Sequence, residues 1–206
     1  MHRRQLMGAA AAAPVALAAP AIAQTQSPEV RWRLASSVPR PLDILFFGAE
    51  HVARRAAELT EGRFQIRAFP AGEIVPALQV LDAVQNGTIE CGQTPLYWYI
   101  GKEPALTFFT SIPFGGNFRQ QTAWMRRGGG NELCAEILAE FNCVGLPCGD
   151  TGAQMGGWFR GEIRSLADVG GLKFRIAGMG GQIFQRLGAS PALIAGSDVY
   201  PALERG

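Results

Sequence analysis

The sequence predicts an α/β fold divided into two lobes with mainly parallel sheets, of which the second lobe is incomplete. Short segments typical of strands alternate with amphipathic helical segments, and this order favours parallel sheets. A segment with four glycines in nine residues, Gly149–Gly157, then interrupts the pattern and suits a crossover between lobes. About 57 residues remain beyond residue 149, which is near the lower limit for a self-sufficient core.

The first predicted lobe spans residues 24–149. Its strands show apolar and polar residues in alternation, and its helices show apolar residues recurring every three or four positions. Gly62 and Gly87 follow two of these helices and are expected to end them. The expected order is a strand at Trp32–Ala35, a helix at 48–61, a strand at Phe64–Ala68, a helix at 73–86, a strand at 88–92, helices at 118–127 and 131–141, and a strand at Val144–Pro147.

The hinge and the partial second lobe span residues 150–206. The expected elements are a helical turn at Ser165–Val169, a strand at Lys173–Ile176, a helix at Gln182–Leu187 and a last helix that begins at Ser197. Pro201 is compatible with that last helix, because in the first turn its missing N–H costs little. A glycine such as Gly206 normally caps a helix and leads into a further strand, so the chain is expected to stop within the lobe.

Residues 1–23 have the features of a secretory signal peptide. His2-Arg3-Arg4 gives a positive start, residues 8–23 form an uncharged alanine-rich run, and Ala21-Ile22-Ala23 supplies a small-x-small cleavage pattern. Arg3–Met7 also resembles a twin-arginine export motif. The run is too short and too rich in alanine for a good membrane span. We therefore expect a periplasmic protein whose mature chain has about 183 of the 206 residues.

The composition argues against nucleic-acid binding and against hydrolase chemistry. Loss of Arg3 and Arg4 takes the 19 basic residues to 17, equal to the 17 acidic residues, so no basic footprint for nucleic acid remains. His51 is the one histidine left for a catalytic triad, and its charged neighbours favour a solvated helix face. The four cysteines form no Cys-x-x-Cys pair. A Cys143–Cys148 disulfide and free buried thiols both remain open.

An enzyme alternative depends on the glycine cluster Gly178-Met179-Gly180-Gly181. This cluster follows a predicted strand and opens a helix, with Asp198 about 20 residues further on, as in a dinucleotide-binding fingerprint. The third position of the fingerprint, however, is occupied by Ile183, which is too large for close packing of the helix against the strand. We therefore predict that the protein is not an enzyme.

Several segments together resemble the periplasmic receptors of TRAP transporters, in the DctP-like family. The subgroup they resemble binds 2-oxo acids and other monocarboxylates with a metal ion. The most specific segment is Ser165–Arg175 (SLADVGGLKFR), which contains the family's Gly-Leu-Lys-x-Arg motif. The other matching segments are Gly72–Pro76, Leu81–Glu90, Thr151–Trp158, Ile194–Gly196 and Tyr200–Glu204. The resemblance implies a periplasmic-binding-protein-like fold, TRAP membrane subunits as partners, and a homodimer in full-length relatives rather than in this chain.

The resemblance implies that Arg175 binds the carboxylate of the ligand. The chemistry of the residue agrees, because a guanidinium is a planar, two-pronged donor that matches a carboxylate. The predicted position of Arg175 at the end of a strand is also where ligands bind in parallel sheets. The alternative is a weak surface ion pair, for which Asp168 is the candidate partner.

The resemblance assigns roles to four further residues. Gln154 is expected to ligate a Na⁺ or Ca²⁺ ion that bridges protein and substrate, with a hydrogen-bonding turn residue as the alternative. Tyr97 and Tyr99 are expected to line the pocket and donate hydroxyls, whereas Trp98 is better explained by packing. Asp150 stands where family members often carry Asn, and an aspartate repels a bound carboxylate unless a cation lies between them.

These expectations combine into one predicted function. The chain is predicted to be the periplasmic solute-binding component of a TRAP-type transporter, which captures a small 2-oxo or monocarboxylic acid for delivery to the membrane subunits. The alternative is a truncated, non-functional fragment of such a protein, because two-lobed receptors close around their ligand and half a lobe cannot close.

Overall fold

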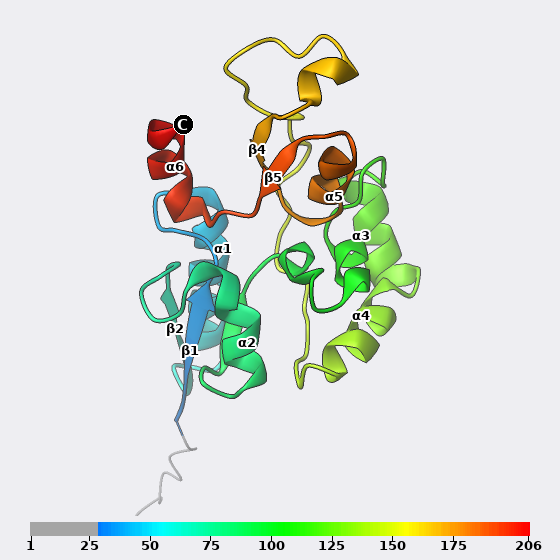
Figure 1. Cartoon of the computed structure of the whole chain (residues 1–206). Coiled ribbons are helices and arrows are strands. Elements are labelled where there is room, and N and C mark those ends of the chain that lie inside the picture. The colour runs from blue at the N-terminus through cyan, green and yellow to red at the C-terminus, as the bar shows by residue number, and fades with distance from the viewer. Residues whose placement is uncertain (1–28) are drawn as a thin grey trace, which may run out of the picture.

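The computed structural model describes residues 29–206, and the predicted signal peptide lies outside these residues. A three-stranded sheet has the order β2-β1-β3, and a two-stranded sheet pairs β4 with β5; all three pairings are parallel. Figure 1 shows the two sheets in separate parts of the molecule. We call residues 30–142 the first lobe, residues 143–165 the crossover and residues 166–206 the second lobe. The strands are β1 (Val30–Ser36), β2 (Phe64–Phe69), β3 (Cys91–Gln93), β4 (Lys173–Arg175) and β5 (Ser190–Ala192).

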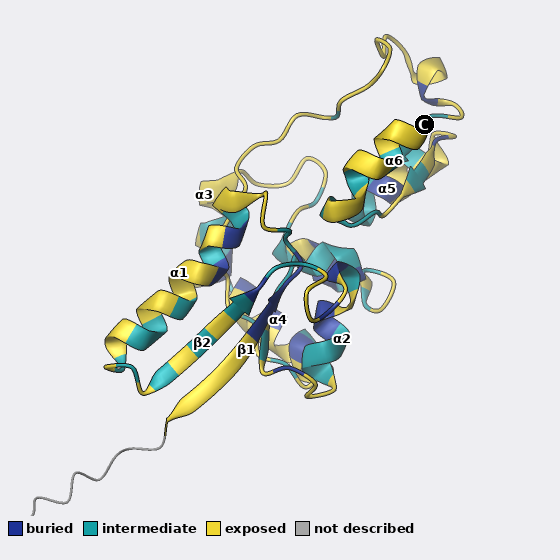
Figure 2. Ribbon diagram, turned by 90° about the vertical axis from the view of Figure 1, so that its left-hand side faces the viewer, coloured by how far each residue is buried: buried dark blue, intermediate teal, exposed yellow. Residues whose placement is uncertain are grey.

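Helices surround the sheet of the first lobe. The helix α1 packs mainly against β2, and α2 packs against β3, whereas α3 and α4 pack against each other. Buried residues concentrate around β1 and α2 in Figure 2, and the crossover is largely exposed. The bounds are α1 (Asp43–Leu59), α2 (Val80–Gln85), α3 (Phe118–Arg127) and α4 (Gly130–Ala139), with short 3-10 helices η1 (Ala77–Gln79), η2 (Leu96–Tyr99) and η3 (Pro104–Phe109).

The first lobe contains two buried apolar clusters. The smaller one lies where β1 meets α2 and consists of Ala35, Val75, Val80 and Ile89. The larger one joins η2 and η3 to α3 and α4, and consists of Leu81, Tyr99, Leu106, Met125, Cys134 and Leu138. Burial of apolar side chains is the main favourable term in folding, so these clusters are the source of most of the stability of this lobe.

The second lobe is smaller and depends on aromatic contacts. It contains η4 (Leu166–Val169), β4, α5 (Gly178–Arg186), β5, η5 (Gly196–Asp198) and α6 (Val199–Arg205). The ring of Phe174 on β4 lies 4.8 Å from that of Phe184 on α5 and 5.2 Å from that of Phe159 in the crossover, measured between centroids. The Phe174–Phe184 pair is edge-to-face and the Phe159–Phe174 pair is tilted. Aromatic pairs of this kind stabilise a core beyond the area they bury. Phe159 therefore ties the end of the crossover to the second lobe.

The structure differs from the sequence prediction in several elements. The helix expected at 48–61 begins earlier, at Asp43, and the helix expected at 73–86 is confined to η1 and α2. The strand expected at Val144–Pro147 is absent, because no described strand lies beside it to pair with its backbone. The strand β5 was not predicted because it contains Pro191, which is tolerated in a strand only at an edge or an end.

Two further features bear on the earlier predictions. All four cysteines, which lie within the described residues, are free thiols, so Cys143 and Cys148 do not form a disulfide here. Between residues 29 and 206, no helix combines the length and the apolar character needed to cross a membrane.

A bidentate ion pair joins β1 to the start of β3 and predicts how stability depends on pH. Arg33 donates to the Glu90 carboxylate from its backbone N (2.8 Å), its Nε (3.0 Å) and its Nη2 (2.7 Å). These hydrogen bonds, with that of the Arg33 side chain foremost, lower the pKa of Glu90 from 4.5 to about 2. A carboxylate with a lowered pKa in the folded state stabilises the fold above its unfolded pKa, and this contribution is lost as pH falls through the folded pKa.

We therefore expect Glu90→Gln to lower the free energy of unfolding at pH 7 and to have progressively less effect between pH 4.5 and about 2. Urea denaturation of both proteins across this pH range measures the effect. Glu29→Gln is the matched control, because it removes an exposed pair with Arg31 only two residues away in the chain. If the difference in unfolding free energy between the wild type and Glu90→Gln stayed constant down to pH 2, the Arg33–Glu90 pair would not be the source of the stabilisation.

Candidate functional site

The two lobes meet at two glycines of the second lobe. Gly178, the first residue of α5, has a φ of +65°, and a Cβ at this position would lie 2.7 Å from Cδ2 of Tyr97. The Tyr97 ring therefore lies directly against the backbone of α5, where no larger residue fits without a shift. At the second contact, a Cβ at Gly196 would lie 3.4 Å from Cδ of Pro39 and 3.7 Å from Cδ1 of Leu42. Tyr97 is thus placed at the junction of the lobes.

Arg175 is the last residue of β4 and its side chain is exposed. Nε and Nη2 donate hydrogen bonds to the carbonyl oxygen of Ile194, at 3.0 and 2.9 Å. The edge of the guanidinium formed by Nη1 and Nη2 keeps two outward N–H groups that no described residue accepts from. The structure therefore offers a paired donor edge at the carboxyl end of a parallel strand, three residues before Gly178.

The alternative of an Arg175–Asp168 ion pair is not formed among the described residues. The carboxylate of Asp168 accepts hydrogen bonds from the backbone N of Arg164 (3.0 Å) and from the backbone N and Oγ of Ser165 (2.7 and 3.0 Å). These donors, with the Arg164 backbone foremost, hold the pKa of Asp168 below its usual range. Asp168 is thus occupied in capping η4 and does not compete for the guanidinium.

Asp150 and Gln154 both lie in the exposed crossover. Oδ1 of Asp150 accepts from the backbone N of Gly152 at 2.6 Å, and Nε2 of Gln154 donates to Oγ1 of Thr151 at 2.8 Å. The amide oxygen of Gln154 is left without a hydrogen-bond donor among the described residues. No hydrogen bond or ion pair within residues 29–206 joins either residue to Arg175. The predicted ligand residues are therefore not assembled into one contact set in this structure.

The placement of Tyr99 does not support a direct contact with ligand. Its side chain is only 4% exposed and belongs to the larger cluster of the first lobe. Its hydroxyl accepts from the backbone N of Leu81 at 3.2 Å and lies 2.9 Å from Oγ1 of Thr94. Both bonds point into the protein, so in this structure the Tyr99 side chain is engaged in internal packing and hydrogen bonding. Trp98 packs against the same cluster, in agreement with the packing role predicted for it.

A buried polar network at the carboxyl ends of β1 and β3 was not predicted. Ser36 Oγ donates to Oε1 of Gln93 at 2.6 Å, and Nε2 of Gln93 donates to the carbonyl of Leu45 at 3.0 Å. Ser37 Oγ lies 2.7 Å from Oγ1 of Thr94, which in turn contacts Tyr99. This network holds the turn that carries Tyr97 against the sheet. The sequence signal that could have found it is the pair of serines directly after the apolar end of β1.

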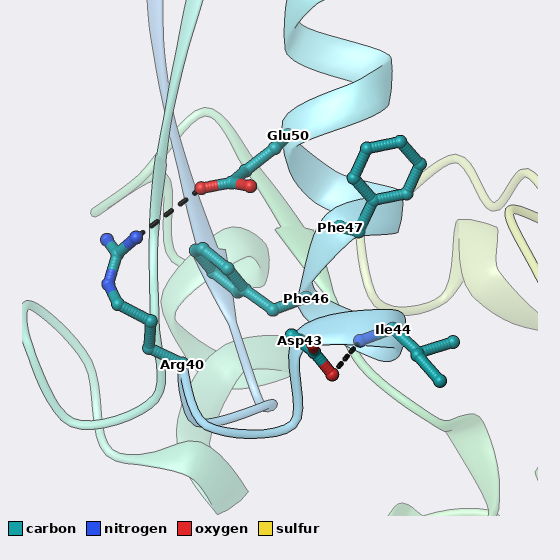
Figure 3. Close-up of a pocket in the computed structure, with 6 residues that line it drawn as sticks. All are labelled: Arg40, Asp43, Ile44, Phe46, Phe47 and Glu50. Carbon is teal, nitrogen blue, oxygen red and sulfur yellow. Dashed lines mark hydrogen bonds and ion pairs between the residues drawn. The ribbon is translucent and has the colours of Figure 1, made fainter.

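Two hollows in the surface of the described residues lie away from the predicted ligand residues. One lies at the start of α1 (Figure 3), where the Arg40 guanidinium sits 5.0 Å from the Phe46 ring centroid and its Nη1 lies 3.4 Å from the Glu50 carboxylate. Another is lined by Gln182, Gln185 and Arg186 of α5. Arg40 is paired with Glu50, and Asp43, the other carboxylate of the first hollow, accepts from the backbone N of Ile44 at 2.8 Å. Two carboxylates and one paired guanidinium do not favour binding of an anionic ligand there.

Two lobes with parallel sheets, joined by a glycine-rich crossover and carrying an arginine at a strand end, are the arrangement expected of a bilobal solute-binding protein. The sequence model described as "Bacterial extracellular solute-binding protein, family 7" (DctP) matches residues 35–206, and the chain belongs to this family. The family membership confirms the predicted resemblance. The members of this family are solute-binding proteins and not enzymes.

Individual relatives agree with the family assignment. The "Monocarboxylate 2-oxoacid-binding periplasmic protein" of Nostoc sp. is 52% identical over 213 residues, which cover 100% of this chain and 58% of the relative. A TRAP transporter solute-binding protein of Bordetella bronchiseptica, with calcium and picolinate in one active site, is 48% identical with a TM-score of 0.85, over 87% of this chain and 54% of that one. A TRAP periplasmic solute-binding protein of Pseudoalteromonas atlantica with bound sodium and pyruvate is 39% identical with a TM-score of 0.83. The match covers 86% of this chain and 54% of that one.

These structural likenesses confirm the predicted fold class. The chain spans about half the length of the relatives it matches.

Proposed function

We propose that this chain is the solute-binding component of a TRAP-type transporter, which binds a small 2-oxo or monocarboxylic acid in the periplasm and delivers it to the membrane subunits. The observation that carries the proposal is the free Nη1–Nη2 edge of Arg175 at the carboxyl end of β4. Such an edge matches a carboxylate with two parallel hydrogen bonds. The 2-oxoacid-binding relative and the picolinate- and pyruvate-bound structures support this ligand class.

Tyr97 is the second residue that we assign to the ligand site. It lies on the first lobe, and its ring touches the backbone of Gly178 three residues after Arg175 in the second lobe. A ligand bound by Arg175 near this junction would therefore be within reach of a side chain from the opposite lobe. Contacts from both lobes are what allow a ligand to favour the closed form of a two-lobed receptor.

A metal ion completes the proposed site. The free amide oxygen of Gln154 and the carboxylate of Asp150 are hard oxygen donors of the kind that Ca²⁺ prefers. A cation near Asp150 would also offset its repulsion of the ligand carboxylate. Residues 29–206 contain no cluster of three or more His, Cys, Asp or Glu side chains that could hold a metal. We propose that oxygens of the bound ligand also take part in the coordination. The calcium- and sodium-containing relatives support this proposal.

Isothermal titration calorimetry with pyruvate tests the proposal. We expect binding in the presence of Ca²⁺ or Na⁺, and loss of that binding in a chelator-treated, sodium-free buffer, because the cation offsets the charge of Asp150 and the ligand together. Lactate serves as a comparison ligand that keeps the carboxylate but lacks the 2-oxo group. Absence of binding to either acid under every condition would overturn the proposal. It would favour the alternative that the 206 residues form a fragment without a complete site.

A further inference from the structure

We propose that the loop Leu193–Gly196 positions Arg175, so that a ligand carboxylate binds the Nη1–Nη2 edge and the arginine responds to the contact between the lobes. The inference deepens the proposed function, because it concerns the same guanidinium. It depends on three features of the described structure. These are the bonds to Ile194, the anchoring of the loop at both ends, and the contact of Gly196 with the first lobe.

The carbonyl of Ile194 occupies one edge of the guanidinium. Nε and Nη2 both donate to this single oxygen, at 3.0 and 2.9 Å. A guanidinium presents two edges that can bind a carboxylate with two hydrogen bonds, the Nε–Nη2 edge and the Nη1–Nη2 edge. Because the first edge is engaged and the plane of the group is thereby fixed, the second edge is the one presented to a ligand.

The loop that supplies this carbonyl is anchored at both ends. The backbone N of Ile176 donates to the carbonyl of Ala192 at 3.2 Å, which continues the pairing of β4 with β5 past Arg175. At the other end, the backbone N of Asp198 donates to the carbonyl of Ala195 at 2.9 Å and starts η5. The carbonyl of Ile194 therefore belongs to a short, restrained loop and can hold the guanidinium in one orientation.

The same loop rests on the first lobe. A Cβ at Gly196 would lie 3.4 and 3.5 Å from Cδ and Cγ of Pro39 and 3.7 Å from Cδ1 of Leu42. There is room at Gly196 for at most a methyl group before Pro39 or the loop must move. A change in the spacing of the lobes at this point would thus be transmitted through two residues to Ile194, and from Ile194 to Arg175.

Side-chain NMR of the whole 206-residue chain labelled with ¹⁵N-arginine tests the positioning without any ligand. We expect the Nε proton of Arg175 to exchange with water about tenfold or more slowly than that of Arg186, an exposed arginine without a hydrogen bond to any described residue. Gly196→Leu should abolish this protection, because the larger side chain displaces the loop from Pro39 and Leu42. Gly161→Leu, at an exposed glycine with no atom within 4 Å of a Cβ, should leave it unchanged.

A compensating variant separates displacement of the loop from general misfolding. Combining Gly196→Leu with Pro39→Ala and Leu42→Ala makes room on the first lobe and should restore the protection of the Arg175 Nε proton. The positioning is overturned if that proton exchanges as fast as the one of Arg186 in the wild type. It is also overturned if Gly196→Leu leaves the protection intact.

A second arm adds pyruvate with Ca²⁺ to the labelled chain. We expect the Nη resonances of Arg175 to shift while its Nε proton stays protected, and a loss of Nε protection on adding pyruvate would overturn the orientation. If pyruvate changes none of the arginine resonances, the proposed function fails. The first arm still decides whether the loop positions the guanidinium, so the two failures are distinguishable.

Discussion

Arg175→Ala is expected to weaken pyruvate binding by at least about 100-fold, because two hydrogen bonds to a charged partner are worth roughly 1.5–3 kcal/mol each. The free Nη1–Nη2 edge provides both of these bonds. Calorimetric titration of the variant in the buffer in which the wild type binds best measures the loss.

Arg175→Lys distinguishes the geometry of this residue from its charge. Lysine keeps the positive charge but presents a compact ammonium in place of a planar guanidinium. It therefore cannot donate two parallel hydrogen bonds to a carboxylate while also donating to the carbonyl of Ile194. We expect the affinity for pyruvate to fall by more than about tenfold, because at least one of the two hydrogen bonds to the ligand carboxylate is lost. Arg186→Ala is the matched control, because it removes an exposed arginine from α5 in the same lobe. Equal affinities of Arg175→Lys and the wild type would show that charge alone is sufficient and that the fork is not used.

The sequence predicted those parts of the fold that depend on local periodicity. The alternation in Phe64–Phe69 and the apolar stripe of α1 are properties of neighbouring residues, and both elements occur in the structure. The start of α1 and the strand β5 depend on contacts that form only in three dimensions. Proline at position 191 counts against a strand in any local pattern, but β4 supplies a partner on one side.

The candidate site shows the same division between local and tertiary information. Arg175 was predicted as a site residue because it ends a motif, and Tyr97 because it belongs to a group of aromatic residues; both assignments stay predictions. The sequence could not distinguish Tyr97 from Tyr99, because residues two apart on a 3-10 helix point to different sides and the position of the core decides which side is buried. The carbonyl of Ile194 could not be predicted from any residue type, because every residue has one.

Phe46→Ala is expected to produce the largest loss of stability, about 3–5 kcal/mol in the free energy of unfolding. The Phe46 side chain is only 2% exposed on the buried face of α1, and its ring also lies under the guanidinium of Arg40 at 5.0 Å. Removal of the ring leaves a cavity between α1 and the sheet and ends the contact with Arg40. Urea denaturation at pH 7 followed by far-UV circular dichroism measures the change.

The adjacent residue provides an internal control for this prediction. Phe47 has the same side chain on the same helix but is 50% exposed, so Phe47→Ala should cost less than about 1 kcal/mol. Similar losses for the two variants would mean that α1 is rotated relative to the sheet, with Phe46 no longer buried. Such a rotation would also move Leu42, which directly precedes α1 and supports Gly196. We therefore expect the packing of Phe46 to be coupled to the loop that is proposed to position Arg175, so that the stability of the first lobe would contribute to the geometry of this arginine in the second.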